Sequence, residues 1–382
     1  MPPFAHPQYN LFMLIGIDCR LPTYQMGGIS QYTIHLVRAL GELPGVDRFK
    51  IFHMRREPRS FLPAENMNYS RSNVYTPCHH RYEKFTLSAE LIRHRLDVFH
   101  SPDFIPPKFG ASRKVITVHD LTFMFYPQFL TAESRRYYYG QIEWAVADAD
   151  HIIADSEATR DDIITHLGVT KSKITPIHLA ANPVYEAVYT QEEINRTIVK
   201  FGLPKGFILA VGTLEPRKNL VNLLRAYERL HRDYSVIVPL VLVGGKGWFY
   251  DQIFNTISEL SLENHVIHLG RVGDETLAHL YHAAGVLAFP SYYEGFGLPP
   301  LEAMHCGCPI IASNRGSIPE VVGDAAISLD PDDRDAWVDS LYRVLIDADL
   351  ARSLRESGYE QALKFTWAQT AEKTMAVYLG GE

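Results

Sequence analysis

Cysteines and long apolar runs are both scarce in this 382-residue chain. Cys19, Cys78, Cys306 and Cys308 are too few and too scattered for a disulfide framework, and the CGC segment has no second cysteine pair with which to bind zinc. No apolar run approaches the ~18 residues that predict a membrane span. The N-terminus lacks the basic start, apolar middle and cleavage site of a secretory signal. We therefore expect residues 1–10 to form a loose leader and the protein to work in a reducing cytoplasm.

An excess of positive charge is also absent, which argues against a general nucleic-acid-binding protein. The net charge is −7, and residues 1–185 carry 20 Lys+Arg against 18 Asp+Glu, so the negative excess lies in the second half. The first half nevertheless contains four basic segments, at 55–59, 79–84, 92–95 and 134–140. These segments are either solvated faces or contacts with an anionic partner such as a lipid headgroup.

Apolar runs alternate with helical patterns along most of the chain. The first series of expected strands covers 11–18, 50–54, 97–101, 114–120 and 151–156, with helices at 131–149 and 157–167. The second series covers 207–212, 240–245, 265–270, 286–291 and 309–313, each followed by a helical segment. Near-continuous apolar strands that alternate with helices predict parallel sheets covered by helices on both faces.

Two such series predict an α/β protein with two doubly wound, Rossmann-like domains that face each other across a cleft. We place the N-terminal domain at 11–185 and the C-terminal domain at 186–365. The segment 366–382 has no strand left to join, and we expect it to pack back on the first domain as a helix. Ligands of open parallel sheets bind beyond the carboxyl ends of the strands, so we expect the chemistry in the strand-to-helix loops.

The dinucleotide fingerprint GxGxxG is absent, but three loops carry other signals. Gly27 and Gly28 open the first expected helix, where they allow a phosphate to approach closely, although tight turns use the same pair. His119 ends an apolar run without metal-site spacing, and it is either a contact for a substrate hydroxyl or a hydrogen-bonded structural residue. Arg217 and Lys218 precede a helix start, where cations are unfavourable unless an anion such as a diphosphate binds there. Solvated loop charge is the alternative for this pair.

The segment YYEGFGLPPLEA, at 292–303, follows an expected strand. Pro299 and Pro300 suit the first turn of a helix, where a missing N–H costs nothing. Glu294 is therefore expected on a glycine-bearing loop, and Glu302 one turn into the helix behind it. A helix N-terminus flanked by carboxylates suits a ligand that offers both phosphates and hydroxyls, which indicates a nucleotide, a sugar or both.

Five segments in this order resemble one enzyme family. They are MGGISQY, TVHDL, ADSEATRDDI, GTLEPRKNL and EGFGLPPLE, and the last matches the E-x7-E signature of retaining glycosyltransferases. From about residue 11 to 380, the chain resembles a family 4 glycosyltransferase of the GT-B fold. The resemblance implies a nucleotide-sugar donor bound mainly by the C-terminal domain. It also implies that the N-terminal domain binds a saccharide or lipid-linked saccharide acceptor.

The resemblance also assigns roles to individual residues. Glu302 would accept hydrogen bonds from the ribose hydroxyls, while Glu294 and His119 would lie by the donor sugar. Arg217 and Lys218 would neutralise the diphosphate. The remaining donor contacts would come from Gly27, Gly28, Thr213, Phe296, Gly297 and Leu298, with Arg271 and Val272 flanking the base. Many family members carry arginine where this chain has Thr213, so we infer that Arg217 supplies the missing charge.

The implied activity is retaining, metal-independent transfer of a hexose to a hydroxyl of a growing saccharide or lipid-linked acceptor, in surface or exopolysaccharide biosynthesis. No metal or other cofactor is expected. UDP-glucose-type donors are favoured, with GDP-mannose as the other donor, and segment 134–140 would suit peripheral contact with a membrane. Two alternatives stay open. One is a sugar-nucleotide epimerase on the same fold, and the other is a nucleotide-binding protein with a degenerate site.

Overall fold

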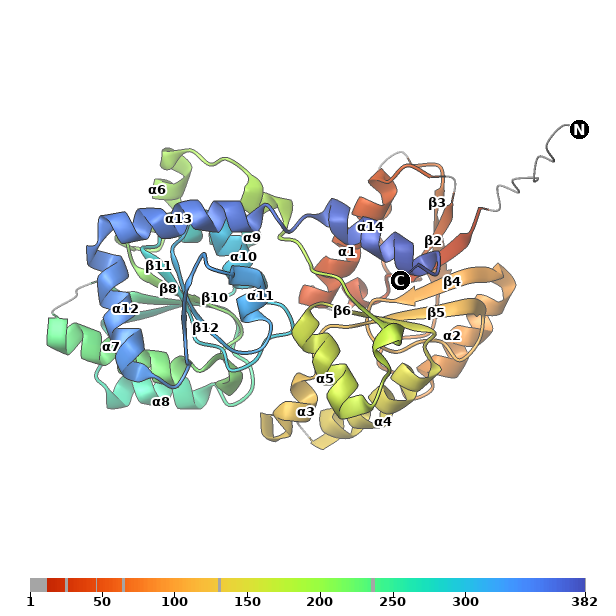
Figure 1. Cartoon of the computed structure of the whole chain (residues 1–382), viewed down its shortest axis with the longest axis horizontal. Helices are drawn as coiled ribbons and strands as arrows, with labels where there is room; N and C mark the ends of the chain where they lie inside the picture. The colour runs from red at the N-terminus through yellow and green to blue at the C-terminus, as the bar shows by residue number, and fades with distance from the viewer. Residues whose placement is uncertain are drawn as a thin grey trace, which may run out of the picture.

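The computed structural model describes residues 12–24, 27–45, 47–63, 66–129, 132–234 and 238–381, with the side chains of 129, 132–134, 136 and 137 excepted. The leader predicted at 1–10 lies outside the described residues. Two lobes lie side by side in Figure 1, and each lobe contains one sheet. Every strand pair in both sheets is parallel, as the alternating pattern predicts.

The first sheet has seven strands in the order β3-β2-β1-β4-β5-β6-β7. In that order the strands are β3 (Tyr69–Val74), β2 (Arg48–Met54), β1 (Leu14–Asp18), β4 (Leu96–Ser101), β5 (Ala111–Val118), β6 (His151–Ala154) and β7 (Ile174–Pro176). The sequence pattern missed β3 and β7. The edge strand β3 has no apolar run, because only its end residues, Tyr69 and Val74, are buried.

The second sheet has six strands in the order β10-β9-β8-β11-β12-β13. They are β10 (Val266–Gly270), β9 (Leu240–Val243), β8 (Ile208–Val211), β11 (Val286–Phe289), β12 (Ile310–Ser313) and β13 (Ile327–Leu329). The central strands β8, β9, β11 and β12 are almost entirely buried, which explains their continuous apolar sequences. The edge strand β13 was not predicted, since it is only partly buried.

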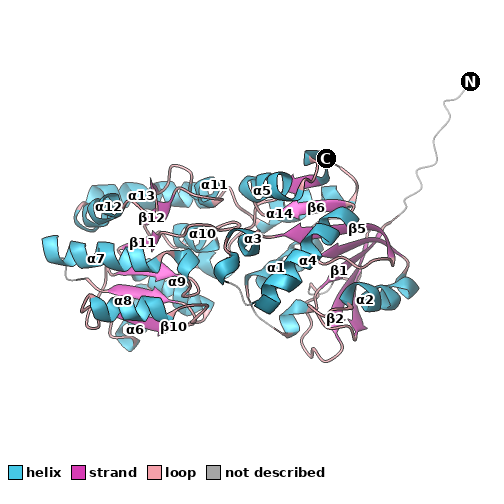
Figure 2. Ribbon diagram, turned by 90° about the horizontal axis from the view of Figure 1, so that it is seen from below, coloured by secondary structure: helices cyan, strands magenta, loops and turns pink. Residues whose placement is uncertain are grey.

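Helices cover both faces of each sheet (Figure 2). In the first half they are α1 (Gly28–Glu42), α2 (Glu83–Leu91), α3 (Thr122–Phe125), α4 (Ala132–Asp148) and α5 (Glu157–Leu167). In the second half they are α6 (Gln191–Lys200), α7 (Leu220–Tyr234), α8 (Asp251–Glu259), α9 (Asp274–Ala283), α10 (Leu298–His305), α11 (Ile318–Val322), α12 (Arg334–Ile346), α13 (Ala348–Ala362) and α14 (Trp367–Tyr378).

The last helix, α14, returns to the first lobe and lies against α1 (Figure 1). The ring of Trp367 stacks on His35 with centroids 5.2 Å apart, and the hydroxyl of Tyr378 lies 2.7 Å from Nδ1 of His100. Residues of α1, α14 and the second sheet belong to one hydrophobic core cluster, which therefore joins the two lobes.

Each sheet reverses its strand order at one point, between β1 and β4 in the first and between β8 and β11 in the second. Crevices at such reversals are where ligands of doubly wound sheets bind. Gly27, Gly28, Arg217, Lys218 and Glu294 all lie in loops or helix starts that follow one of these four strands. The topology thus places the predicted site residues at the expected edges of the two sheets.

Candidate functional site

The segment 292–303 forms a loop and then the first turns of α10, as its prolines and glycines predict. The loop is held from behind by Ser317, whose hydroxyl lies 2.8 Å from the carbonyl of Glu294 and 2.7 Å from that of Phe296. Gly297 caps α10 with φ of +118°, a conformation that L side chains rarely adopt. The turn therefore requires glycine at this position, and it fixes where the helix begins.

Glu294 forms two ion pairs with the loop that follows β8. Its carboxylate oxygens lie 2.5 Å from Nζ of Lys218 and 2.7 Å from Nη1 of Arg217. Glu294 is 9% exposed and Lys218 is 8% exposed, so solvated loop charge is excluded as a description of this cluster. Burial opposes ionisation, but the positive charges of Arg217 and Lys218 lower the pKa of Glu294 to about 2. Glu294 is therefore a fixed negative charge at neutral pH.

The guanidinium of Arg217 is almost fully used by protein groups. Nε and Nη2 donate to Oε1 of Glu215 at 3.1 and 2.8 Å, and Nη1 donates to the carbonyl of Tyr293 at 2.6 Å as well as to Glu294. Arg217 therefore positions the Glu294 loop. Among the described residues, Nζ of Lys218 has Glu294 as its only hydrogen-bond partner. Lys218 therefore keeps more hydrogen-bonding capacity for a ligand than Arg217 does.

Thr213, Arg271 and Val272 lie in the loops at the carboxyl edge of the second sheet. A Cβ added at Gly247 would lie 2.6 Å from Cγ2 of Thr213, so Thr213 packs against the backbone of the loop after β9. The side chain of Arg271 passes close to Gly245 in the same loop, while Val272 is half-buried against the core. These residues lie outside the lining of the pocket that contains Glu302.

A pocket of about 340 Å3 lies between the two lobes and contains Glu302. Gly27 and Gly28 at the start of α1 line one side, and Leu298 at the start of α10 lines the other. A Cβ added at Gly28 would meet no atom within 4 Å, so the protein's own packing does not require glycine there. The bare backbone instead leaves the N-terminus of α1 open to the pocket, where the helix dipole favours an anion.

Glu302 has no ion-pair partner in the described part of the chain. Its Oε2 accepts a hydrogen bond from the hydroxyl of Tyr281 at 3.0 Å. Burial raises the pKa of Glu302 to about 7, although the Tyr281 hydrogen bond acts in the opposite direction. The folded-state pKa of Glu302 lies above its ordinary value of 4.5. Its contribution to the free energy of unfolding therefore falls as the pH rises from about 4.5 to 7. A ligand that donates hydrogen bonds to this carboxylate would offset that loss.

His119 is held on both sides of its ring. Nδ1 lies 2.7 Å from Oδ2 of Asp155, and Nε2 lies 2.7 Å from the carbonyl of Pro102. Burial disfavours the charged ring, but the Asp155 carboxylate outweighs it and raises the pKa of His119 to about 9. Both nitrogens are thus bonded to protein, so the predicted contact with a sugar hydroxyl would require one of these bonds to be exchanged.

Two family models match successive parts of the chain. The model described as Glycosyltransferase Family 4 matches residues 26–184, and the model described as Glycosyl transferases group 1 matches residues 191–361. An O-antigen chain mannosyltransferase B of Escherichia coli is 31% identical over 373 residues, which cover 93% of this chain and 96% of the relative. The chain is a family 4 glycosyltransferase of the GT-B fold.

Solved structures agree with this assignment of the fold. Sucrose-phosphate synthase from Thermosynechococcus elongatus superposes with a TM-score of 0.75 at 21% identity, covering 96% of this chain and 98% of that one. WaaG, a glycosyltransferase involved in lipopolysaccharide biosynthesis, superposes with a TM-score of 0.73 at 15% identity, covering 97% and 100%. At these sequence identities the structural similarity supports the assignment of the fold only.

In this glycosyltransferase the Glu294 loop also contacts the first domain. A Cβ at Gly295 would lie 2.0 Å from the carbonyl oxygen of His119, so only glycine allows the two backbones to meet. The hydroxyl of Ser156 donates to the carbonyl of Gly295 at 2.7 Å. From α11, Glu320 accepts hydrogen bonds from the backbone N–H groups of Glu157 and Ala158, which open α5. These contacts position the Glu294 loop against His119.

Sequence reasoning missed four residues that support the site. Asp155 and Ser156 belong to the quoted segment ADSEATRDDI but had no role, while Ser317 and Tyr281 carry no motif at all. Each acts on a residue that was predicted, through a contact between segments far apart in the chain. Only the positions of Asp155 and Ser156, at the end of the strand predicted over 151–156, could have been a signal.

Proposed function

We propose that this glycosyltransferase moves mannose from GDP-mannose to a hydroxyl of a growing saccharide, with retention of anomeric configuration and without a metal, in surface polysaccharide assembly. The observation that carries the choice of sugar is the relative that matches 93% of the chain, which is named an O-antigen chain mannosyltransferase. Three Escherichia coli relatives named serotype-specific mannosyltransferase WbdA, at 32% identity over 58% of this chain, favour the same sugar, although the match covers only about 28% of their length.

The sequence alone favoured a UDP-glucose-type donor, without a residue to decide between the bases. The names of the relatives support mannose as the sugar, so GDP-mannose takes the first place in the proposal.

We assign the donor to the pocket that contains Glu302. Its carboxylate would accept hydrogen bonds from the ribose hydroxyls, and the base would extend beyond the pocket lining to lie between Arg271 and Val272. The diphosphate would lie between the two helix starts, at Gly27 and Gly28 on one side. On the other, the backbone N–H groups of Phe296, Gly297 and Leu298 have no hydrogen-bond partner among the described residues. These donors suit an anion.

Lys218 would stabilise the negative charge that develops on the departing diphosphate, since a fixed cation in a buried site acts strongly there. Its present partner, Glu294, would turn toward the hydroxyls of the donor sugar. Arg217, held by Glu215 and Tyr293, would keep the backbone of the Glu294 loop in place while the carboxylate turns, and it would supply the charge that Thr213 lacks. His119, with its raised pKa, would lie at the reacting face of the sugar as a second cation. This arrangement supplies charge stabilisation from the chain itself, so no divalent metal is required.

We also propose peripheral contact with an anionic membrane at its cytoplasmic face. No helix in the described ranges is both long and apolar enough to cross a bilayer. The predicted contact segment, 134–140, lies on α4, but the side chains of 134, 136 and 137 lie outside the described residues. On α2, Phe85 is 50% exposed, and Ile92, just beyond the end of this helix, is 56% exposed. Exposed apolar residues beside arginines suit a headgroup surface.

Flotation with phosphatidylglycerol vesicles tests this contact. The double variant Phe85→Ser and Ile92→Ser should reduce the bound fraction severalfold. The variant Ile346→Ser, which changes a residue that is 59% exposed on α12 of the second domain, is the control and should bind as the parent does. Equal binding of all three proteins would remove the membrane proposal.

Thermal unfolding with UDP, GDP, ADP and dTDP, each with and without EDTA, tests the donor. A ligand at ~100 times its dissociation constant adds about 2.7 kcal/mol to the free energy of unfolding, which shifts the midpoint visibly. We expect a shift with GDP that EDTA does not change, and formation of a mannoside from GDP-mannose. A shift with UDP alone would replace the donor, and a loss of transfer in EDTA that manganese restores would contradict the metal-independent mechanism.

A further inference from the structure

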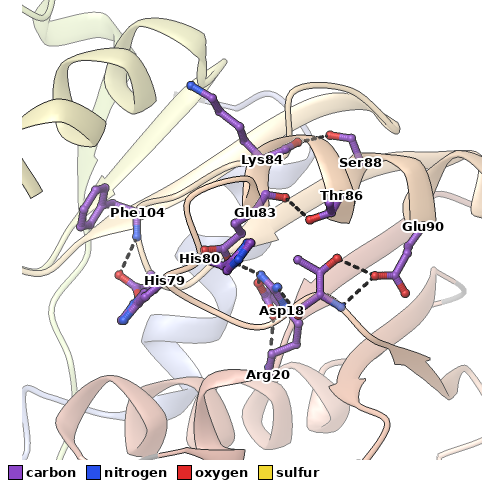
Figure 3. A network of polar contacts seen from close by, with 12 residues as sticks. Asp18, Arg20, His79, His80, Glu83, Lys84, Thr86, Ser88, Glu90 and Phe104 are labelled. Carbon is purple, nitrogen blue, oxygen red and sulfur yellow. Dashed lines mark hydrogen bonds and ion pairs between the residues drawn. The ribbon is translucent and has the colours of Figure 1, made fainter. Parts of the chain in front are cut away.

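A second charged cluster lies at the carboxyl edge of the first sheet. None of its members was predicted as a site residue, although His79 and Glu83 belong to the basic segment 79–84. Arg20, just after β1, is fully buried. Its guanidinium donates to Asp18 and to Glu83, each at 2.6 Å, and to the carbonyl of Thr76 at 2.8 Å (Figure 3). These partners come from β1, from α2 and from the loop after β3, so the cluster joins three elements at one edge of the sheet.

A second pair extends the cluster toward His119. His79 and Asp103 form an ion pair, and Asp103 follows β4 directly after Pro102. The carbonyl of Pro102 accepts the hydrogen bond from Nε2 of His119. The pair is less buried than Arg20, with 37% of the His79 side chain and 20% of the Asp103 side chain exposed. The cluster therefore runs from the interior of the first domain to the neighbourhood of the residue predicted to face the donor sugar.

One carboxylate oxygen in this cluster has unused hydrogen-bonding capacity. The side chain of Glu83 is only 5% exposed, and its Oε1 accepts from Arg20. Among the residues that the structure describes, its Oε2 is buried and has no hydrogen-bond partner. A buried acceptor without a partner is unfavourable, so it indicates a group that arrives from outside the chain.

A small cavity of about 20 Å3 lies at this position. Its lining includes the carboxylate residues Asp18, Glu83 and Asp103 together with His79. The volume exceeds the ~10–15 Å3 that one water-sized group needs, and it is too small for a whole sugar ring. The cavity thus fits a single hydroxyl or a single water.

The cavity and the donor pocket share the first turns of α1. Gly27 and Gly28 line the donor pocket, whereas Ile29 and Thr33 line the cavity. One helix start therefore separates the two spaces. A saccharide that places one hydroxyl in the cavity and extends past this helix start would approach the donor pocket.

We propose that the cavity beside Glu83 and Asp103 binds one hydroxyl of the acceptor saccharide and that the acceptor sugar is uncharged at this end, an inference that rests on the proposed function. Carboxylates accept hydrogen bonds from hydroxyls, and Asp18, Glu83 and Asp103 outnumber the cations Arg20 and His79. An acceptor that carried a phosphate at this position would meet a net negative site and would be repelled.

The test uses the full chain, GDP-mannose as donor, and methyl α-D-mannopyranoside as the acceptor probe. Glu83→Gln keeps an oxygen for Arg20 but replaces Oε2 by an amide donor. Asp103→Asn is a second variant at a more exposed position, for the case that Glu83→Gln fails to fold. Both should raise the KM for the acceptor at least tenfold, while hydrolysis of GDP-mannose without acceptor and the thermal shift with GDP stay unchanged.

Glu90→Gln is the matched control on the same helix. Its carboxylate accepts hydrogen bonds from the backbone N–H groups of Tyr75 and Thr76 and from the Thr76 hydroxyl, so it holds the loop without facing the cavity. This variant should lose stability and keep the acceptor KM. An acceptor KM that rises equally in Glu90→Gln would reduce Glu83 to a structural residue and would overturn the proposal.

A second measurement separates this inference from the donor assignment. Saturation-transfer NMR with methyl α-D-mannopyranoside and no nucleotide should detect binding that Glu83→Gln removes, and the 6-phosphate of the same sugar should bind more weakly. Equal or tighter binding of the phosphate would overturn the uncharged-acceptor proposal. Binding of the sugar with no response to any nucleotide would leave the acceptor site intact and would contradict the proposed donor function.

Discussion

Glu294 and Glu302 lie eight positions apart in one short segment and are both buried from solvent to a large extent, yet their surroundings are opposite. Glu294 is paired with Lys218 and Arg217, which lower its pKa to about 2. Glu302 has only the hydroxyl of Tyr281, and burial raises its pKa to about 7. The same residue type, in the same signature, is thus a fixed charge at one end and a titrating group at the other.

This difference teaches that a signature states which side chains are present and not what charge they carry. The charge of Glu294 is set by a loop 76 positions away in the sequence. That of Glu302 is set chiefly by burial, against which the hydroxyl of Tyr281, 21 positions away, acts in the opposite direction. In the proposed reaction the two states are useful in different ways. A fixed charge near the sugar preserves the geometry of the cations, and a carboxylate without a cation gains most from the two hydroxyls of a ribose.

The largest expected effect comes from removing the cation at the Glu294 end. Lys218→Ala should lower the rate of mannosyl transfer by about 10²–10³, the loss typical of removing one group that stabilises developing negative charge. Radiolabelled transfer from GDP-mannose measures it. Lys205→Ala, which changes an exposed lysine in the loop before β8, is the control. A Lys218→Ala variant that transfers mannose at the parent's rate would contradict the proposed role of Lys218 in stabilising the departing diphosphate.

Glu294→Gln should destabilise the protein by about 3 kcal/mol at pH 7, because Lys218 would then be buried without its partner. The folded-state pKa of about 2 lies below the unfolded value of 4.5, so this stability is present above pH 4.5 and is lost as the pH falls toward 2. Denaturant unfolding at pH 7 and at pH 4 measures the change. Adding Lys218→Met should recover part of the loss, and a single variant as stable as the parent at pH 7 would refute the buried pair.

At the other end, the affinity for GDP-mannose should depend on pH. If the ribose hydroxyls bind the ionised form of Glu302, affinity should rise roughly tenfold between pH 6 and pH 8, around the pKa of about 7. The diphosphate diester of this donor has no group that titrates in that range. Calorimetric titration measures it, and Glu302→Gln should bind weakly at every pH with a flat profile. A Glu302→Gln protein with the parent's profile would assign the dependence to another group.

The smallest effect sharpens the comparison. Tyr281→Phe removes the hydroxyl that donates to Glu302 and keeps the ring. Because that hydrogen bond lowers the pKa of Glu302, its loss should move the midpoint of the pH profile upward by a few tenths of a unit to one unit. A downward shift would mean that Tyr281 stabilises the protonated carboxyl instead. The same titration detects either direction.

Much of the fold could be predicted from the sequence, because buried parallel strands have continuous apolar runs and helices have a distinct period. The loop and helix that carry Glu294 and Glu302 follow from local chemistry, since prolines open α10 and Gly297 caps it. The edge strands β3, β7 and β13 could not be predicted, because edge strands are short or half-exposed and their pairing is decided by neighbours.

The pairing of charged side chains could not be predicted from the sequence either, because it too depends on which segments become neighbours in the fold. The ion pairs of Lys218 with Glu294 and of His119 with Asp155 join segments that meet only in the folded chain. The cluster around Arg20 and Glu83 carries no motif, and its members come from three separate elements. Their chemistry is visible only once the first sheet is assembled.

Carboxyl carbon-13 NMR of protein labelled at the glutamate side chains tests the difference between Glu294 and Glu302 most directly, with Glu294→Gln and Glu302→Gln supplying the assignments. The account predicts that the Glu302 resonance titrates near pH 7 and moves when GDP-mannose binds, while the Glu294 resonance stays that of an ionised carboxylate from pH 9 down to pH 4. A Glu302 resonance that titrates near 4.5 and ignores the donor, or a Glu294 resonance that titrates above pH 4, would contradict it.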